Sequence, residues 1–239
     1  MTQTIPAATP QTLLPLHAGP QDDPLAWAEA AALGAGGVAV INLSGNALAG
    51  SDPGARARLA EGIDRLVAAG VEPLGQVSLG YATRPVVDLV GEITGWAVLP
   101  VVGIFLDHAP AGPFQIGPVA LAARIARRAG LHRLVLNPGV PVDPMYRRLD
   151  LTICTFEGPW NEYREWSGEA TRPGEATRPG DGHLVYRVPP REWDLARRLI
   201  AQRGAGLALV SERPGPYLRP AVALDQITKR PAHAAAGLR

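Results

Sequence analysis

The chain has 239 residues, 46% of them hydrophobic, and its 23 Lys and Arg nearly balance its 22 Asp and Glu, which leaves a net charge of +1. This length is close to that of one α/β barrel and is long enough to bury a full core. The balanced charge, with no long basic block, argues against nucleic acid or an anionic membrane surface as the main partner. No run approaches the roughly 18 apolar residues of a membrane helix.

The first 20 residues show neither a charged n-region nor an apolar h-region before their prolines. A secretion signal is therefore not visible, and we expect a cytoplasmic protein. The single cysteine, Cys154, lies in an apolar run and is expected to be a buried, inert thiol.

Short apolar runs alternate with segments of helical periodicity, and Gly or Pro marks most of the boundaries. The expected strands, in chain order, are 13–17, 38–42, 73–79, 101–107, 134–137, 151–157, 183–188 and 207–212. Helices are expected between them at 24–33, 53–69, 85–96, 118–129 and 190–202, with a short helical turn at 145–149 and an aromatic segment at 160–166.

Eight strands joined by crossovers, several of them apolar on both faces, are typical of a parallel sheet covered by helices. Eight repeats favour closure into one (β/α)8 barrel over an open doubly wound sheet. We expect the barrel to span 13–228, between flexible segments at 1–12 and 229–239. The tandem GEATRP repeat within 168–182 indicates a disordered surface loop, or alternatively a lid, on the side where active-site loops lie.

In such a barrel the functional side chains lie at the carboxyl ends of the strands. The runs leading to these ends are mostly apolar, so polarity rises where the mouth of the barrel is expected. The polar residues at the ends are His17, Asn42, Tyr81, Asp107, His108, Asn137, Glu157, Arg187 and Glu212.

Two carboxylates stand out among these residues. Asp107 ends the fourth strand, VVGIFLD, and Glu157 ends the sixth, LTICTFE. Strand alternation turns His108 away from Asp107 unless the strand breaks between them, and it places Glu157 on one face with Ile153 and Thr155. Paired carboxylates at one mouth serve glycoside hydrolysis, one as acid and the other as nucleophile or base. The alternative is that each carboxylate caps a loop or pairs with an arginine.

Other candidates are ligand-binding groups. Asn137 precedes a Pro-Gly turn that holds its amide at the rim, either for a sugar hydroxyl or as a loop cap. His17 is either a hydrogen-bonding group of the pocket or an ordinary satisfied side chain. The flat aromatic faces on which a pyranose ring can pack are those of Tyr81, Trp160, Tyr163 and Tyr217, whereas Trp166 and Trp193 are expected to be packing residues.

The sequence contains no GxSxG elbow, no HExxH motif, no Walker loop and no Cys/His cluster with metal spacing. We therefore expect neither a metal nor a cofactor.

Seven segments, from about Leu13 to Ala221, resemble the spherulin 4 family (spherulation-specific family 4). They are LLPLHAG, VAVINLSG, PLGQVSLGYATRP, VVGIFLDHAP, LVLNPGVPVDPMY, DLTICTFEGPWNEY and LVSERPGPYLRPA. The resemblance implies a (β/α)8 barrel and, for characterised relatives, endo-acting hydrolysis of α-1,4-linked N-acetylgalactosamine polymers without a metal. It matches Asp107 to the family's strand-four aspartate and Glu157 to the glutamate of its TFE motif.

The chain departs from this family pattern at the pocket. His108 replaces the second acid of the usual Asp-Glu pair, His17 stands where an aromatic residue is usual, and the NPxSGPG-like element is reduced to residues 42–45.

Three hypotheses for function remain open. The first is a glycoside hydrolase with Asp107 and Glu157 as the carboxylate pair and His108 as an auxiliary acid or base. The second is a barrel that has lost hydrolysis and binds a carbohydrate or other ligand. The third is an intracellular enzyme that uses the same three residues on a small molecule. All three predict a carbohydrate or other small polar ligand, and the sequence leaves the oligomeric state open.

Overall fold

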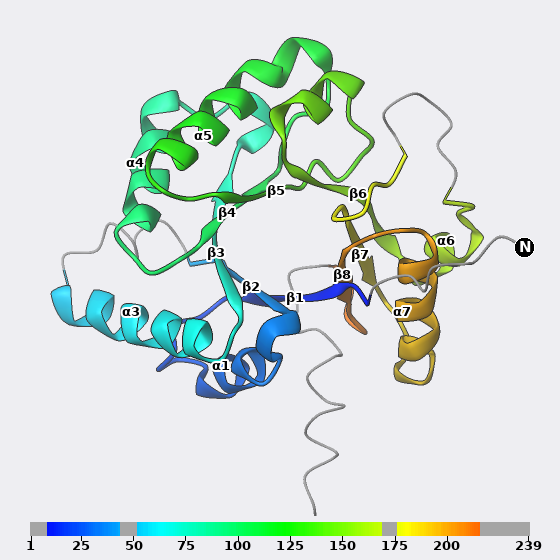
Figure 1. The fold of residues 1–239 in the computed structure, drawn as a ribbon, viewed down its shortest axis with the longest axis horizontal. Helices are drawn as coiled ribbons and strands as arrows, with labels where there is room; N and C mark the ends of the chain where they lie inside the picture. The colour runs from blue at the N-terminus through cyan, green and yellow to red at the C-terminus, as the bar shows by residue number, and fades with distance from the viewer. Residues whose placement is uncertain (1–8, 44–51, 169–175, 216–239) are drawn as a thin grey trace, which may run out of the picture.

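A computed structural model describes residues 9–43, 52–168 and 176–215 of the chain, and Figure 1 shows strands at its centre with helices around them. Eight parallel strands form a closed barrel in chain order. They are β1 (Gln11–Leu16), β2 (Gly37–Ile41), β3 (Glu72–Ser78), β4 (Gly103–Asp107), β5 (Arg133–Leu136), β6 (Thr152–Pro159), β7 (Gly182–Tyr186) and β8 (Leu207–Val210). β1 closes the ring by pairing with β8, Gln11 beside Leu207. The predicted (β/α)8 barrel is confirmed.

The outer layer consists of helices that begin and end close to the predicted residues. They are α1 (Pro24–Ala31), α3 (Pro53–Ala68), α4 (Val86–Ala97), α5 (Ile116–Arg128), α6 (Trp160–Glu165) and α7 (Trp193–Gln202). Asp23 and Asp52 cap α1 and α3, because the side chain of each accepts a hydrogen bond from a backbone N–H group of the first turn. Each aspartate directly precedes a proline, which fixes the backbone of that turn. Among the described residues, no helix combines the length and apolarity needed to cross a bilayer.

The barrel interior is filled by alternate residues of the strands, as the two-residue period requires. Its apolar cluster is Leu13, Val38, Val40, Leu74, Phe105, Val135, Cys154, Leu184, Leu207 and Leu209. Four polar residues each lie two positions beyond a member of this cluster, and so on the same inward face: Gln76, Asp107, Asn137 and Tyr186. The polar mouth is thus a direct continuation of the apolar interior.

Strand β6 breaks this alternation. Its register against β7 shifts between Cys154 and Phe156, as in a β-bulge. Cys154 belongs to the interior cluster, and Glu157, three residues later, is level with the inward-facing Leu184. Ile153 packs instead in the outer layer under the helices. The prediction that Glu157 shares a face with Ile153 and Thr155 was therefore wrong, because the extra residue inverts the alternation.

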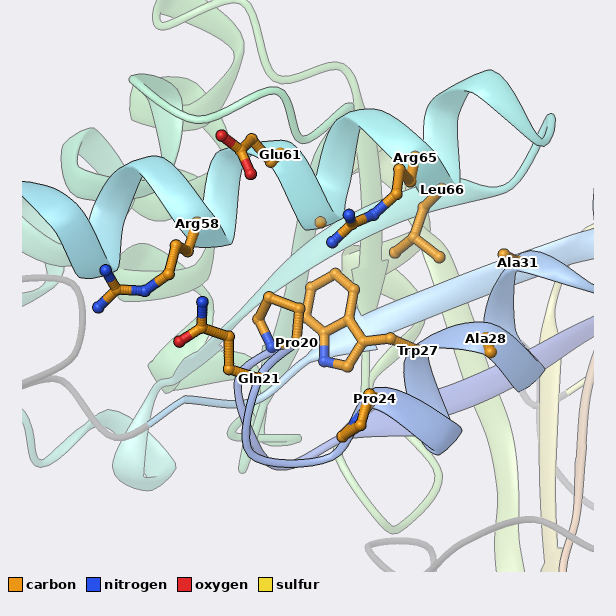
Figure 2. Close-up of a pocket in the computed structure, with 11 residues that line it drawn as sticks. Pro20, Gln21, Pro24, Trp27, Ala28, Ala31, Arg58, Glu61, Arg65 and Leu66 are labelled. Carbon is orange, nitrogen blue, oxygen red and sulfur yellow. The ribbon is translucent and has the colours of Figure 1, made fainter.

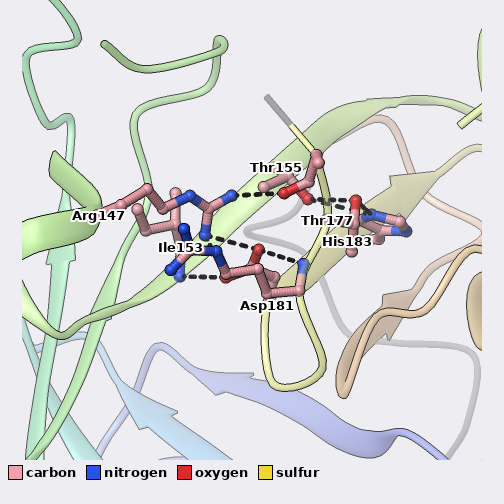
Figure 3. A network of polar contacts seen from close by, with 8 residues as sticks. Arg147, Ile153, Thr155, Thr177, Asp181 and His183 are labelled. Carbon is pink, nitrogen blue, oxygen red and sulfur yellow. Dashed lines mark hydrogen bonds and ion pairs between the residues drawn. The ribbon is translucent and has the colours of Figure 1, made fainter. Parts of the chain in front are cut away.

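A buried ion pair lies at the amino-terminal end of the barrel and is drawn in Figure 3. Arg147 precedes β6, and its Nη1 lies 2.8 and 2.7 Å from the two carboxylate oxygens of Asp181, which precedes β7. The two side chains are 7% and 4% exposed. Asp181 also accepts the backbone N–H groups of Ile153 and Arg178. Groups at this end of a barrel serve stability.

The position predicted for the GEATRP segment also needs correction. The aromatic segment before it forms α6, so residues 166–181 connect a helix to the start of β7. The guanidinium of Arg203, at the carboxyl end of α7, accordingly donates to the carbonyl groups of Tyr163 and Trp166. The described flanks of the repeat therefore lie at the end of the barrel opposite the mouth. Most of the repeat, residues 169–175, lies outside the described residues.

Candidate active site

Asp107 is the last residue of β4 and is only 1% exposed. Its Oδ2 accepts a hydrogen bond of 2.7 Å from Nε2 of Gln76 on the neighbouring β3, and its Oδ1 accepts one of 3.1 Å from Nδ2 of Asn137. Both carboxylate oxygens are thus held by side-chain amides from the flanking strands. Buried polar groups require such partners, so the aspartate has one defined orientation.

Gln76 is itself fixed from the helical layer. The Nε1 atom of Trp96 donates to the backbone carbonyl of Gln76 at 3.1 Å. The Trp96 ring can lie this close because the preceding residue is Gly75, where a Cβ atom would stand 2.2 Å from the ring. A glycine on the outer face of β3 therefore helps to position a donor on its inner face.

Asn137 connects the two candidate carboxylates. Its Nδ2 donates to Asp107 Oδ1 at 3.1 Å and to Glu157 Oε2 at 2.8 Å. The reverse amide orientation would direct a carbonyl oxygen at two carboxylates, so the donor assignment follows from electrostatics. Its Oδ1 atom is buried and has no hydrogen-bond partner among the described residues. An unsatisfied buried acceptor of this kind costs about 1–3 kcal/mol.

Glu157 lies in a less polar environment than an ordinary surface glutamate. Burial raises the pKa of this carboxyl group, and the negative charge of Asp107 raises it further. The hydrogen bond from Asn137 and the positive charge of His108 act in the opposite direction on the pKa. Raised carboxyl pKa values are typical of proton donors in glycosidases.

The strand breaks immediately after Asp107. His108 has a φ of 47°, which ends the β alternation and turns its ring back towards the aspartate. Its Nδ1 lies 3.6 Å from Asp107 Oδ2 and 3.1 Å from Ser78 Oγ. The ring of Tyr81, also at a positive φ of 53°, meets the imidazole edge-to-face with centroids 5.5 Å apart. Non-glycine residues at positive φ carry strain that clusters at functional sites.

These groups surround a cavity of about 280 Å³ at the carboxyl end of the strands. The lining residues are Tyr81, Asp107, His108, Asn137, Pro138, Gly139, Glu157 and Tyr186. The burial of Tyr186 and the charges of Glu157 and Glu162 raise the pKa of its phenol, which Arg187 partly offsets. Tyr81, Asp107, His108, Asn137 and Glu157, all predicted as site residues, are therefore brought together in one place.

Comparison with known proteins identifies the family. The model of spherulation-specific family 4 matches residues 11–228. The chain belongs to this family. Spherulin-4 of Physarum polycephalum is 32% identical over 165 residues, which cover 64% of this chain and 48% of that protein, so the match spans about half the length of the curated relative.

The solved structure of Aspergillus clavatus Sph3 in complex with GalNAc has the same fold. It superimposes with a TM-score of 0.66 over 90% of this chain and 98% of that chain, at 19% sequence identity. The cavity contains two carboxylates, Asp107 and Glu157. They are the residues that the sequence resemblance matches to the family's strand-four aspartate and strand-six glutamate.

The sequence analysis missed Gln76, which donates to Asp107, and Tyr186, which lines the cavity. Gln76 lies inside an apolar strand and Tyr186 ends β7, one position before the predicted Arg187. Arg187 has a φ of 57° and is exposed, outside the cavity lining. The two-residue period was the available signal, because Gln76 and Tyr186 follow Leu74 and Leu184 on the inward face.

The other predicted ligand-binding residues lie elsewhere. Trp160 and Tyr163 are buried between α6, α7 and β7, where Trp160 Nε1 donates to Glu192 and the Tyr163 hydroxyl pairs with His183 Nδ1 at 2.8 Å. Their rings are covered by protein and present no face to a sugar. His17, Asn42 and Glu212 do not line the cavity as described, and Tyr217 lies outside the described residues. The packing roles predicted for Trp166 and Trp193 are confirmed, since Trp166 stacks on Phe156 and Trp193 is 5% exposed.

A larger hollow of about 600 Å³ lies between α1 and α3 and is shown in Figure 2. Trp27, Pro20 and the side chains of Arg58, Glu61 and Arg65 line it. It belongs to the outer helical layer and contains none of the strand-end residues, so we place the functional site at the mouth of the barrel. In the described parts of the chain, no three His, Cys, Asp or Glu side chains are arranged to hold a metal ion.

Proposed function

We propose that this spherulin 4 family member is a glycoside hydrolase that cleaves α-1,4-linked galactosamine or N-acetylgalactosamine polymers with Asp107 and Glu157. The observation that carries the proposal is that one amide nitrogen, Nδ2 of Asn137, holds both carboxylates at the same cavity. Glycosidases use two carboxyl groups that flank the scissile bond at one cavity, and Asp107 and Glu157 provide such a pair. The family resemblance and the fold shared with a GalNAc-bound protein support a sugar ligand.

The environments of the two acids support different roles. Glu157 is the proton donor to the leaving oxygen, because its raised pKa keeps the carboxyl protonated to higher pH than an ordinary glutamate. Asp107 receives two amide hydrogen bonds, which fix the orientation of its carboxylate. Its charge then stabilises the oxocarbenium-like transition state.

The spacing of the acids supports a retaining reaction. The two carboxyl oxygens lie 3.1 and 2.8 Å from one nitrogen, so their separation is at most the sum of these distances. The nearest oxygens of the two carboxyl groups are therefore close together, which favours the separation of roughly 5–5.5 Å found in retaining enzymes over the roughly 6.5–9.5 Å of inverting enzymes.

The experiment is a reducing-end assay on α-1,4-galactosamine polymers of defined N-acetylation, with the wild-type chain and the variants Asp107→Asn and Glu157→Gln. We expect release of reducing ends by the wild type and a loss of about 10²–10⁴-fold in Glu157→Gln. The proposal fails if both variants retain full activity.

A second candidate function is carbohydrate binding without cleavage. It is favoured by the burial of Asp107, 1% exposed with an amide on each oxygen, and by the histidine that follows it. Saturable sugar binding with no reducing ends released from any polymer would select this candidate.

A further inference from the structure

A second cavity lies inside the barrel, directly beneath the mouth. Its volume is about 20 Å³, and we call it the inner cavity, in contrast to the outer cavity of about 280 Å³ that holds the two carboxylates. The lining residues of the inner cavity are Leu13, Pro15, Val40, Gln76, Phe105, Asn137, Leu184 and Leu209. All of them are apolar except Gln76 and Asn137, and Asn137 also lines the outer cavity. The amide of Asn137 therefore separates the two spaces.

The oxygen of this amide is the branch that remains for the inner cavity. The Nδ2 atom of Asn137 is directed at Asp107 and Glu157, which line only the outer cavity. Its Oδ1 atom is buried and has no hydrogen-bond partner among the described residues, and the whole residue is 3% exposed. A buried acceptor of this kind requires a donor.

Gln76 presents a second acceptor to the same space. Its Nε2 atom donates to Asp107, whereas no described residue donates to its Oε1 atom. Gln76 lines the inner cavity and is not part of the lining of the outer one. The inner cavity therefore combines two amide oxygens with apolar walls.

The size and the lining of the inner cavity select its ligand. A buried water molecule needs a volume of about 10–15 Å³ and polar partners. The inner cavity, with about 20 Å³, has room for one water molecule and for nothing larger. A water molecule has two O–H donors for the two amide oxygens. An ammonium ion also donates, but the burial of its charge among apolar side chains is far more costly.

We propose that the inner cavity binds one resident water molecule, which donates to Oδ1 of Asn137 and to Oε1 of Gln76. The nitrogens of the same two amides donate to the carboxylate of Asp107 at 3.1 and 2.7 Å. The water therefore closes a ring of hydrogen bonds that runs from Asp107 through both amides. Each amide is held at its nitrogen and at its oxygen, so the water is a positioning group for Asp107 and, through Asn137, for Glu157.

The wild-type protein provides the first test. We expect a crystal structure that resolves ordered water to show one density peak between the two amide oxygens, about 2.5–3.0 Å from each. In solution, the Nδ2 protons of Asn137 should show a nuclear Overhauser effect to a long-lived water molecule. No density peak between the two amide oxygens overturns the proposal.

The second test displaces the water. Val40→Ile adds one methylene group to the wall of the inner cavity. Val38→Ile is the matched control, because Val38 is the preceding inward-facing residue of β2, is 0% exposed and does not line the cavity. We expect the water to be lost in Val40→Ile and retained in Val38→Ile. A water that persists in Val40→Ile overturns the site. The wild-type measurements decide the site even if Val40→Ile does not fold.

The positioning role has its own readout, the pKa of Glu157 followed by carbon-13 NMR in the substrate-free protein. The hydrogen bond from Asn137 lowers this pKa, so loosening of the amide shifts it upwards. We expect the shift in Val40→Ile and not in Val38→Ile, since the charges of Asp107 and His108 are the same in both. An unchanged pKa after loss of the water overturns the positioning role. None of these measurements uses a substrate, so their outcome is independent of hydrolysis.

Discussion

Asn137 donates from one nitrogen, Nδ2, to Oε2 of Glu157 at 2.8 Å, and the same atom lies 3.1 Å from Oδ1 of Asp107. The amide therefore sets both the distance between the two acids and the pKa of Glu157, which its hydrogen bond lowers.

Asn137→Ala removes the bridge without removing either acid. Because the lost hydrogen bond had lowered the pKa of Glu157, that pKa rises, and the alkaline limb of the kcat/KM profile moves to higher pH. We also expect a loss of about 10²-fold in kcat/KM, since the acids lose their fixed geometry. The control is Asn161→Ala, at an exposed position of α6. An unchanged pH profile in Asn137→Ala would contradict a positioning role.

His108→Glu restores the acidic pair of the family. The histidine charge lowers the pKa of Glu157, so replacing it with a third carboxylate raises that pKa. We expect the alkaline limb of activity to shift upwards. The exposed His132→Glu, at the amino end of β5, is the matched control. A downward shift of that limb would show that His108 does not act on Glu157 electrostatically.

The stereochemical outcome follows from the separation of the acids. Proton NMR of the first product formed by the wild-type enzyme is expected to show the α-anomer, which means net retention. Initial formation of the β-anomer would place a water molecule between Asp107 and Glu157 and contradict the close spacing in the structure.

Asp181→Ala leaves the guanidinium of Arg147 buried and uncompensated. We expect a loss of about 3–5 kcal/mol in the free energy of unfolding, measured by urea denaturation. Asp194→Ala is the control, because it breaks a surface ion pair with Arg197 in which the aspartate side chain is 76% exposed. This variant should lose less than about 1 kcal/mol in the free energy of unfolding. Similar losses in both variants would mean that the buried pair contributes no more than a surface pair.

His183 predicts acid sensitivity of the fold. Burial lowers its pKa from 6.5 to about 3, and the positive charge of Arg203 adds to this shift. Since the unfolded state binds the proton more readily, this residue's contribution to stability is complete above pH 6.5 and is lost as pH falls from there towards 3. The slope is about 1.4 kcal/mol per pH unit in that window. His183→Gln should flatten the slope, measured by denaturation at pH 4 to 7, and an equally steep slope in this variant would assign it to other groups.

Much of the fold was readable because local patterns and tertiary packing agree. The apolar runs become strands close to the predicted residues, and α3 begins at Pro53 behind the cap formed by Asp52. The side on which the GEATRP segment lies could not be read correctly, because the six-residue helix α6 was taken as part of a connecting segment.

The aromatic residues were harder to assign. Trp160 and Tyr163 follow a strand end and have the chemistry of a sugar platform, yet the short helix turns their rings into the packing around His183 and Trp193. Sequence spacing does not show which side of so short a helix is covered. Tyr81, whose backbone adopts a positive φ beside His108, is exposed at the cavity instead.

The sequence by itself determined the eightfold alternation, the family and the position of Asp107, because a regular two-residue period carries the inward face of β4 from Phe105 to the mouth. Only the tertiary structure decided how Glu157 and His108 join it. The bulge in β6 inverts the inward–outward alternation of that strand, so the side chain of Glu157 faces the cavity. The positive φ of His108 ends the alternation of β4, so the side chain of His108 also faces the cavity. Such irregularities depend on the pairing with neighbouring strands and on the turns that follow them, and neither is encoded in the hydrophobic pattern of a single strand.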